Sequence, residues 1–180
     1  MIAAAALADT LDAAVRCGAD RVVLALDGRP GPWCPPGVKV ARQGEGTLDR
    51  RLATAWTAAR GPALQVGMDT PQLSAADLDE ALAHLNDGGV DAVIGPATDG
   101  GWWTVGLHRP DPHVFVGVPT SRADTGARQH ARLAALGLRT HTLRTLTDVD
   151  TWPDAAAVAA AAPGTRFADA VRRVGAGTPP

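Results

Sequence analysis

The sequence predicts an α/β domain in which helices cover both faces of a mostly parallel sheet, giving a three-layer sandwich. Short continuous apolar runs, typical of buried parallel strands, alternate along the chain with helical segments. Acidic residues directly follow several of these runs, where an open α/β sheet places its ligands. The 180 residues, 46% of them hydrophobic, are enough for one core and too few for two ordinary domains.

Periodicity, together with Gly and Pro punctuation, places the first elements. In order, we expect a helix at 3–17, a strand at 21–26, a loop at 29–37, a short strand at 38–41, a helix from Thr47 to Arg60, a strand at 63–68 and a helix at 75–86. Thr47 is expected to cap its helix. Ser74 and Asp77 resemble a capping box at the start of the helix at 75–86.

The second half continues the alternation of strands and helices. We expect strands at 91–95 and 102–107 on either side of a turn, a helix at 124–136, a strand at 138–143 and helices at 152–162 and 166–174. Residues 1–174 are predicted to form the domain, and residues 175–180 a flexible tail.

Composition excludes several classes of protein. With a net charge of -2 and Lys39 as its only lysine, the chain has no basic footprint for nucleic acid. No apolar stretch approaches the roughly 20 residues that span a bilayer. Two cysteines and five histidines without ligand spacing predict neither a disulfide framework nor a zinc site. We therefore expect a cytoplasmic protein that binds neither nucleic acid nor membrane.

Asp69 directly follows the strand predicted at 63–68, within the motif Gly67-Met68-Asp69-Thr70-Pro71. Pro71 fixes the turn, so the carboxylate can bind a Mg²⁺ or Mn²⁺ ion that bridges diphosphate oxygens. The alternative is that Asp69 begins an Asx turn before the helix capped by Ser74.

Asp99-Gly100-Gly101 lies between the two strands at 91–95 and 102–107. The glycines let the backbone approach a ligand, Asp99 can hold a sugar hydroxyl, and Trp102 or Trp103 can stack on it. The alternative is a hairpin turn followed by core tryptophans. Because strand side chains alternate, at most one of the two tryptophans faces a given pocket.

Asp148 and Asp150 lie on the same side of an extended segment, so both can approach one cation. Alternatively, they serve as the N-cap and the first-turn acid of the helix that follows.

Taken together, these motifs resemble a bacterial GT-A-like family proposed to be nucleotide-diphospho-sugar transferases, related in fold to molybdenum-cofactor and phospholactate nucleotidylyltransferases. The resemblance runs from about Ala4 to Val174. It rests on Arg42-Gln43-Gly44 with 48–52, Gly67 to Pro71, Gly95 to Trp103, Gly117-Val118-Pro119 with Asp124-Thr125-Gly126, and Asp148 to Thr151.

The resemblance implies a nucleotide or nucleotide-sugar site at the carboxyl edge of the sheet. Asp69 and Asp99 would be catalytic, and Asp69, Asp148 and Asp150 would bind Mg²⁺ or Mn²⁺. Substrate contacts are expected from Gly67, Thr70, Pro71, Gly100, Gly101, Trp102 and Asp124. The implied reaction is glycosyl transfer from a nucleotide-diphospho-sugar, or alternatively transfer of a nucleotide from a nucleoside triphosphate to a phosphorylated small molecule. A non-catalytic binding or assembly domain is the third interpretation.

The chain departs from the family at its first residues. Family members begin with a strand and a basic, glycine-containing phosphate loop, and this sequence starts at what resembles the helix after them. We therefore expect a sheet that lacks the usual first strand, with unpaired edge groups and an exposed apolar groove. A start codon assigned too late, a homodimer that fills the gap, or a degenerate protein would each account for this.

Overall fold

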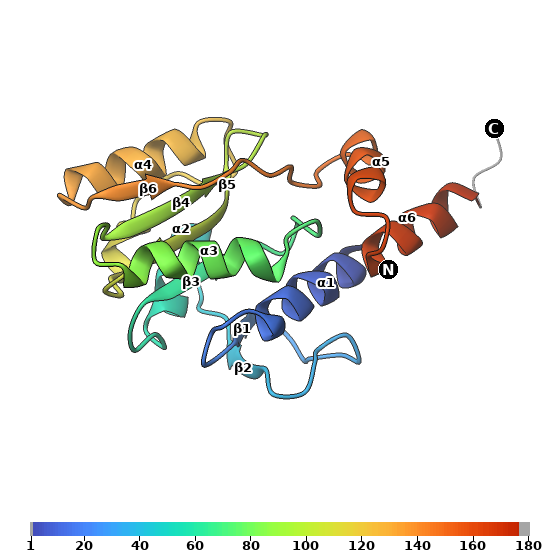
Figure 1. Cartoon of the computed structure of the whole chain (residues 1–180), viewed down its shortest axis with the longest axis horizontal. Coiled ribbons are helices and arrows are strands. Elements are labelled where there is room, and N and C mark those ends of the chain that lie inside the picture. Colours follow the sequence, from blue (N-terminus) through green and yellow to red (C-terminus); the bar gives the residue numbers. More distant parts are fainter. Residues whose placement is uncertain (1, 177–180) are drawn as a thin grey trace.

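Apolar runs of the sequence form strands and the periodic segments form helices in the computed structural model, which describes residues 2–176. The elements in chain order are α1 (Ile2–Arg16), β1 (Val23–Leu26), β2 (Lys39–Arg42), α2 (Leu48–Trp56), β3 (Ala63–Val66), α3 (Ala75–Asn86), β4 (Ala92–Pro96), β5 (Trp102–Leu107), the short 3₁₀ helix η1 (Pro112–Val114), α4 (Thr125–Ala135), β6 (Thr140–Thr142), α5 (Trp152–Ala161) and α6 (Arg166–Ala176) (Figure 1). None of these helices is both long enough and apolar enough to cross a membrane.

Four strands form the larger sheet, in the order β3-β5-β4-β6. β5 is antiparallel to both of its neighbours, while β4 and β6 are parallel. β3, β4 and β6 therefore run in the same direction and β5 in the opposite one. The turn that joins β4 to β5 is the predicted hairpin, and the register shifts at Gly95 and Pro96, just before it. The predicted α/β class with a mostly parallel sheet is confirmed.

β1 and β2 pair in parallel as a separate two-stranded sheet. Among the described strands, β1 pairs only with β2 and β3 only with β5, so each has one unpaired edge. Val23 and Val40 in this small sheet are 36% and 42% exposed. The unpaired edges and exposed apolar side chains agree with the expectation of a sheet that lacks the usual first strand.

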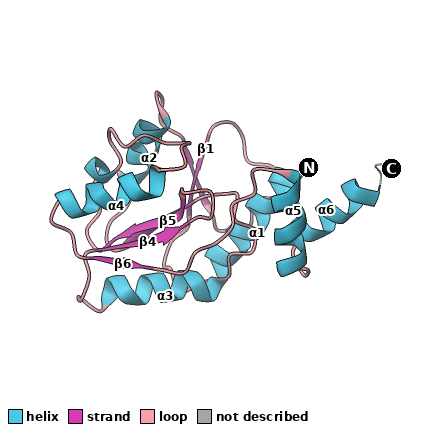
Figure 2. Cartoon of the chain, turned by 90° about the horizontal axis from the view of Figure 1, so that it is seen from above, coloured by secondary structure: helices cyan, strands magenta, loops and turns pink. Residues whose placement is uncertain are grey.

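Helices cover both faces of the four-stranded sheet (Figure 2). On one face, α1 and α3 bury Ala13, Leu78 and Leu85 with Val93 and Trp103 of the sheet. On the other face, α2 and α4 pack with sheet residues in a second core, which contains Ala53, Trp56, Ile94, Val105, Phe115 and Leu133. The sheet is thus the middle layer, and its ends remain available for a site.

Beyond the sheet, α6 packs on α1 and α5 packs on α6, and the three helices share a third core (Figure 1). Phe167 lies at the centre of this third core. The nearly buried Asp9 of α1 accepts hydrogen bonds from the backbone N–H of Phe167 at 2.8 Å and of Arg166 at 3.2 Å. Since these N–H groups begin α6 and have no partner within the helix, Asp9 supplies them with an acceptor.

Several predicted element ends differ from the structure. Helix α2 ends at Trp56 rather than Arg60, because the next three N–H groups bond to carbonyls three residues back and tighten the chain before Gly61-Pro62. Thr47 holds the N-cap position without a side-chain cap bond. Helix α6 continues through Ala176, so the first two residues of the predicted tail are helical, and 177–180 lie outside the described residues.

Candidate active site

The carboxyl ends of the parallel strands gather three of the predicted acidic segments at one edge of the sheet. β3 ends at Val66, just before Asp69, and β4 ends at Pro96, just before the turn that holds Asp99. After β6 the chain continues beside β4, since Leu146 N–H donates to the Pro96 carbonyl at 3.1 Å. This path delivers Asp148 to the same edge, as predicted.

Two cross-links hold the Asp69 loop against the segment that carries Asp148. The backbone N–H of Val149 donates to the carbonyl of Asp69 at 2.9 Å. The side-chain amide of Gln72 donates to the carbonyl of Thr147 at 2.7 Å. Because these bonds are made by Thr147 and Val149, the residues on either side of Asp148, they hold the backbone at Asp148 next to the loop that carries Asp69.

The carboxylates of Asp69, Asp99, Asp148 and Asp150 are called here the acidic cluster, and two of them, Asp69 and Asp148, have raised pKa values. Burial raises the pKa of Asp69 above its ordinary value, and the charges of Asp150 and Asp99 raise it further. Burial raises the pKa of Asp148 to about 7, with smaller contributions from Asp69, Asp99 and Asp150. The like charges around Asp69 and Asp148 thus disfavour their ionised forms, and a cation nearby would favour them.

Buried polar atoms without partners adjoin the acidic cluster. Oδ1 of Asp148 and Oγ1 of Thr70 are buried and have no hydrogen-bond partner in the described part of the chain. Thr70 is fully buried, and Pro71 beside it is also buried. An unpartnered buried oxygen costs free energy, and such atoms mark places where a ligand, ion or water completes the structure.

The cluster fits a cation that shares its coordination with a ligand. Among residues 2–176, no three His, Cys, Asp or Glu side chains converge as a ready-made metal cage. Mg²⁺ does not need one, because it is usually bound by one or two carboxylates together with phosphate oxygens and water. Asp69 and Asp148 can supply the carboxylates, and the exposed Asp150 lies at the outer side of the cluster.

Asp99 braces its own turn. Its Oδ1 accepts a hydrogen bond from the backbone N–H of Gly101 at 2.7 Å, and its side chain is exposed. Gly100 has a φ of 90°, and a Cβ there would lie 1.9 Å from the carbonyl oxygen of Ala123. Gly126 N–H donates to the Gly100 carbonyl at 2.8 Å. The glycines are therefore required for the turn to pack against the start of α4.

The two tryptophans face opposite sides of the sheet, as strand alternation predicts. Trp103 is buried in the core beside α3, and its Nε1 donates to the Arg144 carbonyl at 2.9 Å. Trp102 is partly buried against the other core, with its ring centroid 6.0 Å from that of Phe115. Trp103 is therefore a core residue. One side of the Trp102 ring is packed against the core, so a ligand could contact only its remaining surface.

Asp124 is occupied by two arginines. Its carboxylate forms ion pairs with Arg128 at 2.7 Å and Arg122 at 3.1 Å, and the hydrogen bonds from Arg128 and Arg122 lower its pKa. Ala123, the residue before Asp124, lies against Gly100 of the Asp99 turn. Asp124 therefore lies beside the turn and is not one of the charges that raise the pKa of Asp69 or Asp148.

The alternative role proposed for Asp148 and Asp150, capping of the next helix, is wrong. Thr151 is the N-cap of α5, and Asp154 completes a capping box with it. Both Asp148 and Asp150 precede the cap, so neither is needed to satisfy the first N–H groups of the helix. The capping box predicted for Ser74 and Asp77 at the start of α3 is confirmed.

Comparison with known proteins assigns the chain to a family. Residues 1–122 match the profile of a family described as "Uncharacterized protein conserved in bacteria (DUF2064)". The chain belongs to this family. No curated protein matches the DUF2064 chain.

Solved structures give the DUF2064 chain its fold relatives. A Desulfovibrio desulfuricans protein, proposed to be a nucleotide-diphospho-sugar transferase, is 26% identical with a TM-score of 0.73, over 86% of this chain and 71% of that one. The manganese complex of Rv0371c from Mycobacterium tuberculosis is 20% identical with a TM-score of 0.56, over 85% of each chain. CMP:2-keto-3-deoxy-manno-octonic acid synthetase, complexed with CTP, is 14% identical with a TM-score of 0.60, over 87% of this chain and 86% of that one. The last two share the fold alone. With the Desulfovibrio desulfuricans protein they confirm the resemblance in fold to nucleotide-diphospho-sugar transferases and nucleotidylyltransferases.

Gln72 is the residue of the site that sequence reasoning missed. Its bond to Thr147 joins positions 75 residues apart, so no local pattern could reveal it. The one local signal was that Gln72 is polar although its neighbours Pro71 and Leu73 are buried.

Proposed function

We propose that the DUF2064 chain is a transferase that uses a divalent cation at Asp69 and Asp148 to bind the diphosphate of a nucleotide-sugar. The observation that carries this proposal is the Asp148 carboxylate. It is held beside Asp69 with one oxygen buried and unpartnered, and its pKa is raised to about 7. A carboxylate in such surroundings is disfavoured as an anion unless a cation is present.

Mg²⁺ or Mn²⁺ would supply charge that offsets the diphosphate oxygens. Asp69 and Asp148 would hold the cation, with Asp150 at its outer side. The backbone of the 67–71 loop and of the Asp99-Gly100-Gly101 turn would shape the pocket at the edge of the sheet. The Asp99 carboxylate would accept a hydrogen bond from a sugar hydroxyl. No side chain has to form a covalent intermediate, because positioning and electrostatic stabilisation are sufficient for this class of reaction.

The relatives support different parts of the proposal. The protein from Desulfovibrio desulfuricans, proposed to be a nucleotide-diphospho-sugar transferase, favours glycosyl transfer. The manganese bound to Rv0371c favours a divalent cation. The CTP complex of the sugar-acid synthetase favours the second candidate, transfer of a nucleotide from a nucleoside triphosphate. Fold likeness alone does not choose between these reactions, so the donor has to be measured.

A thermal-shift screen tests the proposal and separates the donors. The full chain is heated with nucleotide-sugars and with nucleoside triphosphates, each with Mn²⁺, with Mg²⁺ or with a chelator. We expect a metal-dependent rise of Tm with one class of donor, because a ligand that binds only the folded state stabilises it. Asp69→Asn should abolish the rise. The matched control Asp20→Asn, at an exposed residue after α1, should keep it. A rise that persists with chelator, or in Asp69→Asn, would contradict the role of the cation.

A further inference from the structure

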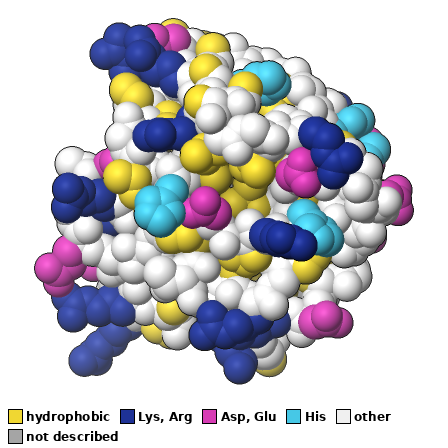
Figure 3. Space-filling view, turned by 90° about the vertical axis from the view of Figure 1, so that its left-hand side faces the viewer, with side chains coloured by type: hydrophobic (Ala, Val, Ile, Leu, Met, Phe, Trp, Pro, Cys, Tyr) yellow, Lys and Arg dark blue, Asp and Glu magenta, His cyan; other side chains and the backbone are white. Residues whose placement is uncertain are grey.

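A cavity lies at the opposite edge of the sheet from the acidic cluster. It is formed where α3 leads into β4, where β5 ends and where α4 leads into β6. Its volume is about 420 Å³, within the range of about 300–1,000 Å³ that small-molecule pockets occupy. Figure 3 views this end of the molecule, and apolar side chains gather near the centre of the face among His, Arg or Lys and acidic side chains.

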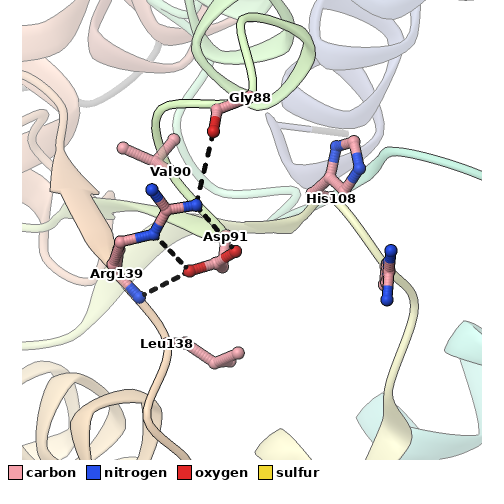
Figure 4. Close-up of a pocket in the computed structure, with 7 residues that line it drawn as sticks. Gly88, Val90, Asp91, His108, Leu138 and Arg139 are labelled. Carbon is pink, nitrogen blue, oxygen red and sulfur yellow. Dashed lines mark hydrogen bonds and ion pairs between the residues drawn. The ribbon is translucent and has the colours of Figure 1, made fainter.

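One wall of the cavity is a neutralised ion pair. The guanidinium and backbone N–H of Arg139 donate to both carboxylate oxygens of Asp91 at 2.9–3.2 Å, and Arg139 also reaches the Gly88 carbonyl at 3.3 Å (Figure 4). Hydrogen bonds from Arg139 lower the pKa of Asp91 to about 2. The only carboxylate that lines the cavity is therefore ionised and already committed to a partner.

The other wall carries His108 and Arg109, of which Arg109 offers free nitrogen donors. Nδ1 of His108 is 2.8 Å from the Leu85 carbonyl. A carbonyl only accepts, so Nδ1 carries the proton. In the neutral ring Nε2 is therefore an acceptor, and it has no partner within the described residues. Arg109, the next residue, is exposed, and its guanidinium has no hydrogen bond or ion pair within the described residues. Figure 4 shows His108 across the cavity from the Asp91–Arg139 pair.

The net charge of the cavity and its apolar lining residues indicate which kind of ligand it can bind. Arg109 and Arg139 against Asp91 leave a net positive charge. Val90 and Leu138, both partly buried, add an apolar surface between the polar groups. We propose that this cavity binds a small organic anion, with its phosphate or carboxylate group on Arg109 and its apolar part on Val90 and Leu138. The proposal is independent of the transferase function.

Amide chemical shifts from a ¹⁵N-labelled sample locate binding directly in a protein of 18.5 kDa. The probes are phenyl phosphate and benzoate, which share an apolar ring and differ in the anionic group. The titration contains chelator and no divalent cation, so that the acidic cluster repels anions. We expect saturable shifts at the amides of Gly88, Val90 and Leu138. The stronger probe identifies the phosphate or carboxylate class.

Arg109→Gln tests the assigned contact, and it should fold normally because Arg109 has no partner to lose. It should weaken binding by about tenfold or more, as expected for loss of a charged hydrogen bond. Arg173→Gln removes the same charge from an exposed residue of α6 and should leave binding unchanged. Asp69→Asn should also leave it unchanged, which separates this cavity from the acidic cluster. No saturable shift at millimolar probe, shifts centred on the acidic cluster, or equal binding by Arg109→Gln would overturn the proposal.

Discussion

Asp148 is held in surroundings that disfavour its negative charge. Its pKa in the folded protein is about 7, against an ordinary value of 3.8, mainly because of burial and then because of the neighbouring acids. The folded state therefore binds this proton more tightly than the unfolded chain does. It follows that Asp148 reduces the free energy of unfolding progressively as the pH rises between these two values, and reduces it most above the higher one.

The first prediction concerns this pH dependence. Without a divalent cation, Asp148→Asn should be more stable than the natural chain above the folded-state pKa, and the difference should shrink at about pH 4. Urea denaturation at several pH values, with chelator present, measures both proteins. Because other groups also contribute to the pH dependence, the comparison is between the slopes of stability against pH for the two proteins. Identical slopes for the natural chain and the variant would contradict the buried, charge-coupled position of Asp148.

Gly100 gives the second prediction at the residue scale. Gly100→Ala places a Cβ 1.9 Å from the Ala123 oxygen at a φ of 90°, so both sterics and backbone conformation oppose it. We expect a loss of about 1–3 kcal/mol in the free energy of unfolding. Gly89→Ala is the matched control, because a Cβ there meets nothing within 4 Å. Equal stability of the two variants would show that the turn is not fixed against the start of α4.

At the scale of elements, two neighbouring residues before α5 have different expected roles: Thr151 caps the helix, and Asp150 contributes to cation binding. Thr151→Ala removes the N-cap and should cost about 0.5–2 kcal/mol of stability without changing metal-dependent binding. Asp150→Asn, one residue earlier, should change stability by less than about 0.5 kcal/mol and weaken the response to Mn²⁺. Chemical denaturation and thermal shift with Mn²⁺ measure the two effects. A loss of stability in Asp150→Asn with an unchanged response to Mn²⁺ would instead indicate that Asp150 caps the helix.

Most elements could be predicted from local sequence, because buried runs and caps leave local signals. The capping box at Ser74 placed α3 correctly, and the apolar runs placed all six strands. The end of α2 was missed because helical periodicity continues past Trp56, where the tightened turn before Gly61-Pro62 stops the helix. The side-chain pattern reveals which face of a helix is buried. It does not reveal where the backbone hydrogen bonds change from the i→i−4 to the i→i−3 type.

The common edge of Asp69, Asp99 and Asp148 was also predictable, because the carboxyl ends of parallel strands meet. The burial of Asp148 and the Gln72–Thr147 bond were not, since both depend on contacts between segments far apart in the sequence. The cavity beside Arg109 was missed for the same reason: its residues come from three separate junctions.

At the scale of the whole molecule, the unpaired edges of β1 and β3 predict self-association. Backbone groups at a strand edge are available to a second chain, and Val23 beside this edge is 36% exposed. Sedimentation at several concentrations should report a dimer. Val23→Asp should shift it toward monomer, because charges on edge strands oppose pairing. Val116→Asp, at a residue 40% exposed outside both sheets, is the control. A monomer at every concentration would contradict strand pairing between copies.

The central claim is that Asp69 and Asp148 hold a divalent cation together with a nucleotide diphosphate. Electron paramagnetic resonance of free Mn²⁺, titrated with the full chain in the presence of a nucleoside diphosphate, measures this directly. We predict that the nucleotide tightens Mn²⁺ binding, and that Asp69→Asn or Asp148→Asn weakens it by about tenfold or more while Asp20→Asn leaves it unchanged. Mn²⁺ binding of equal strength in all four proteins, or none in the natural chain, would contradict the claim.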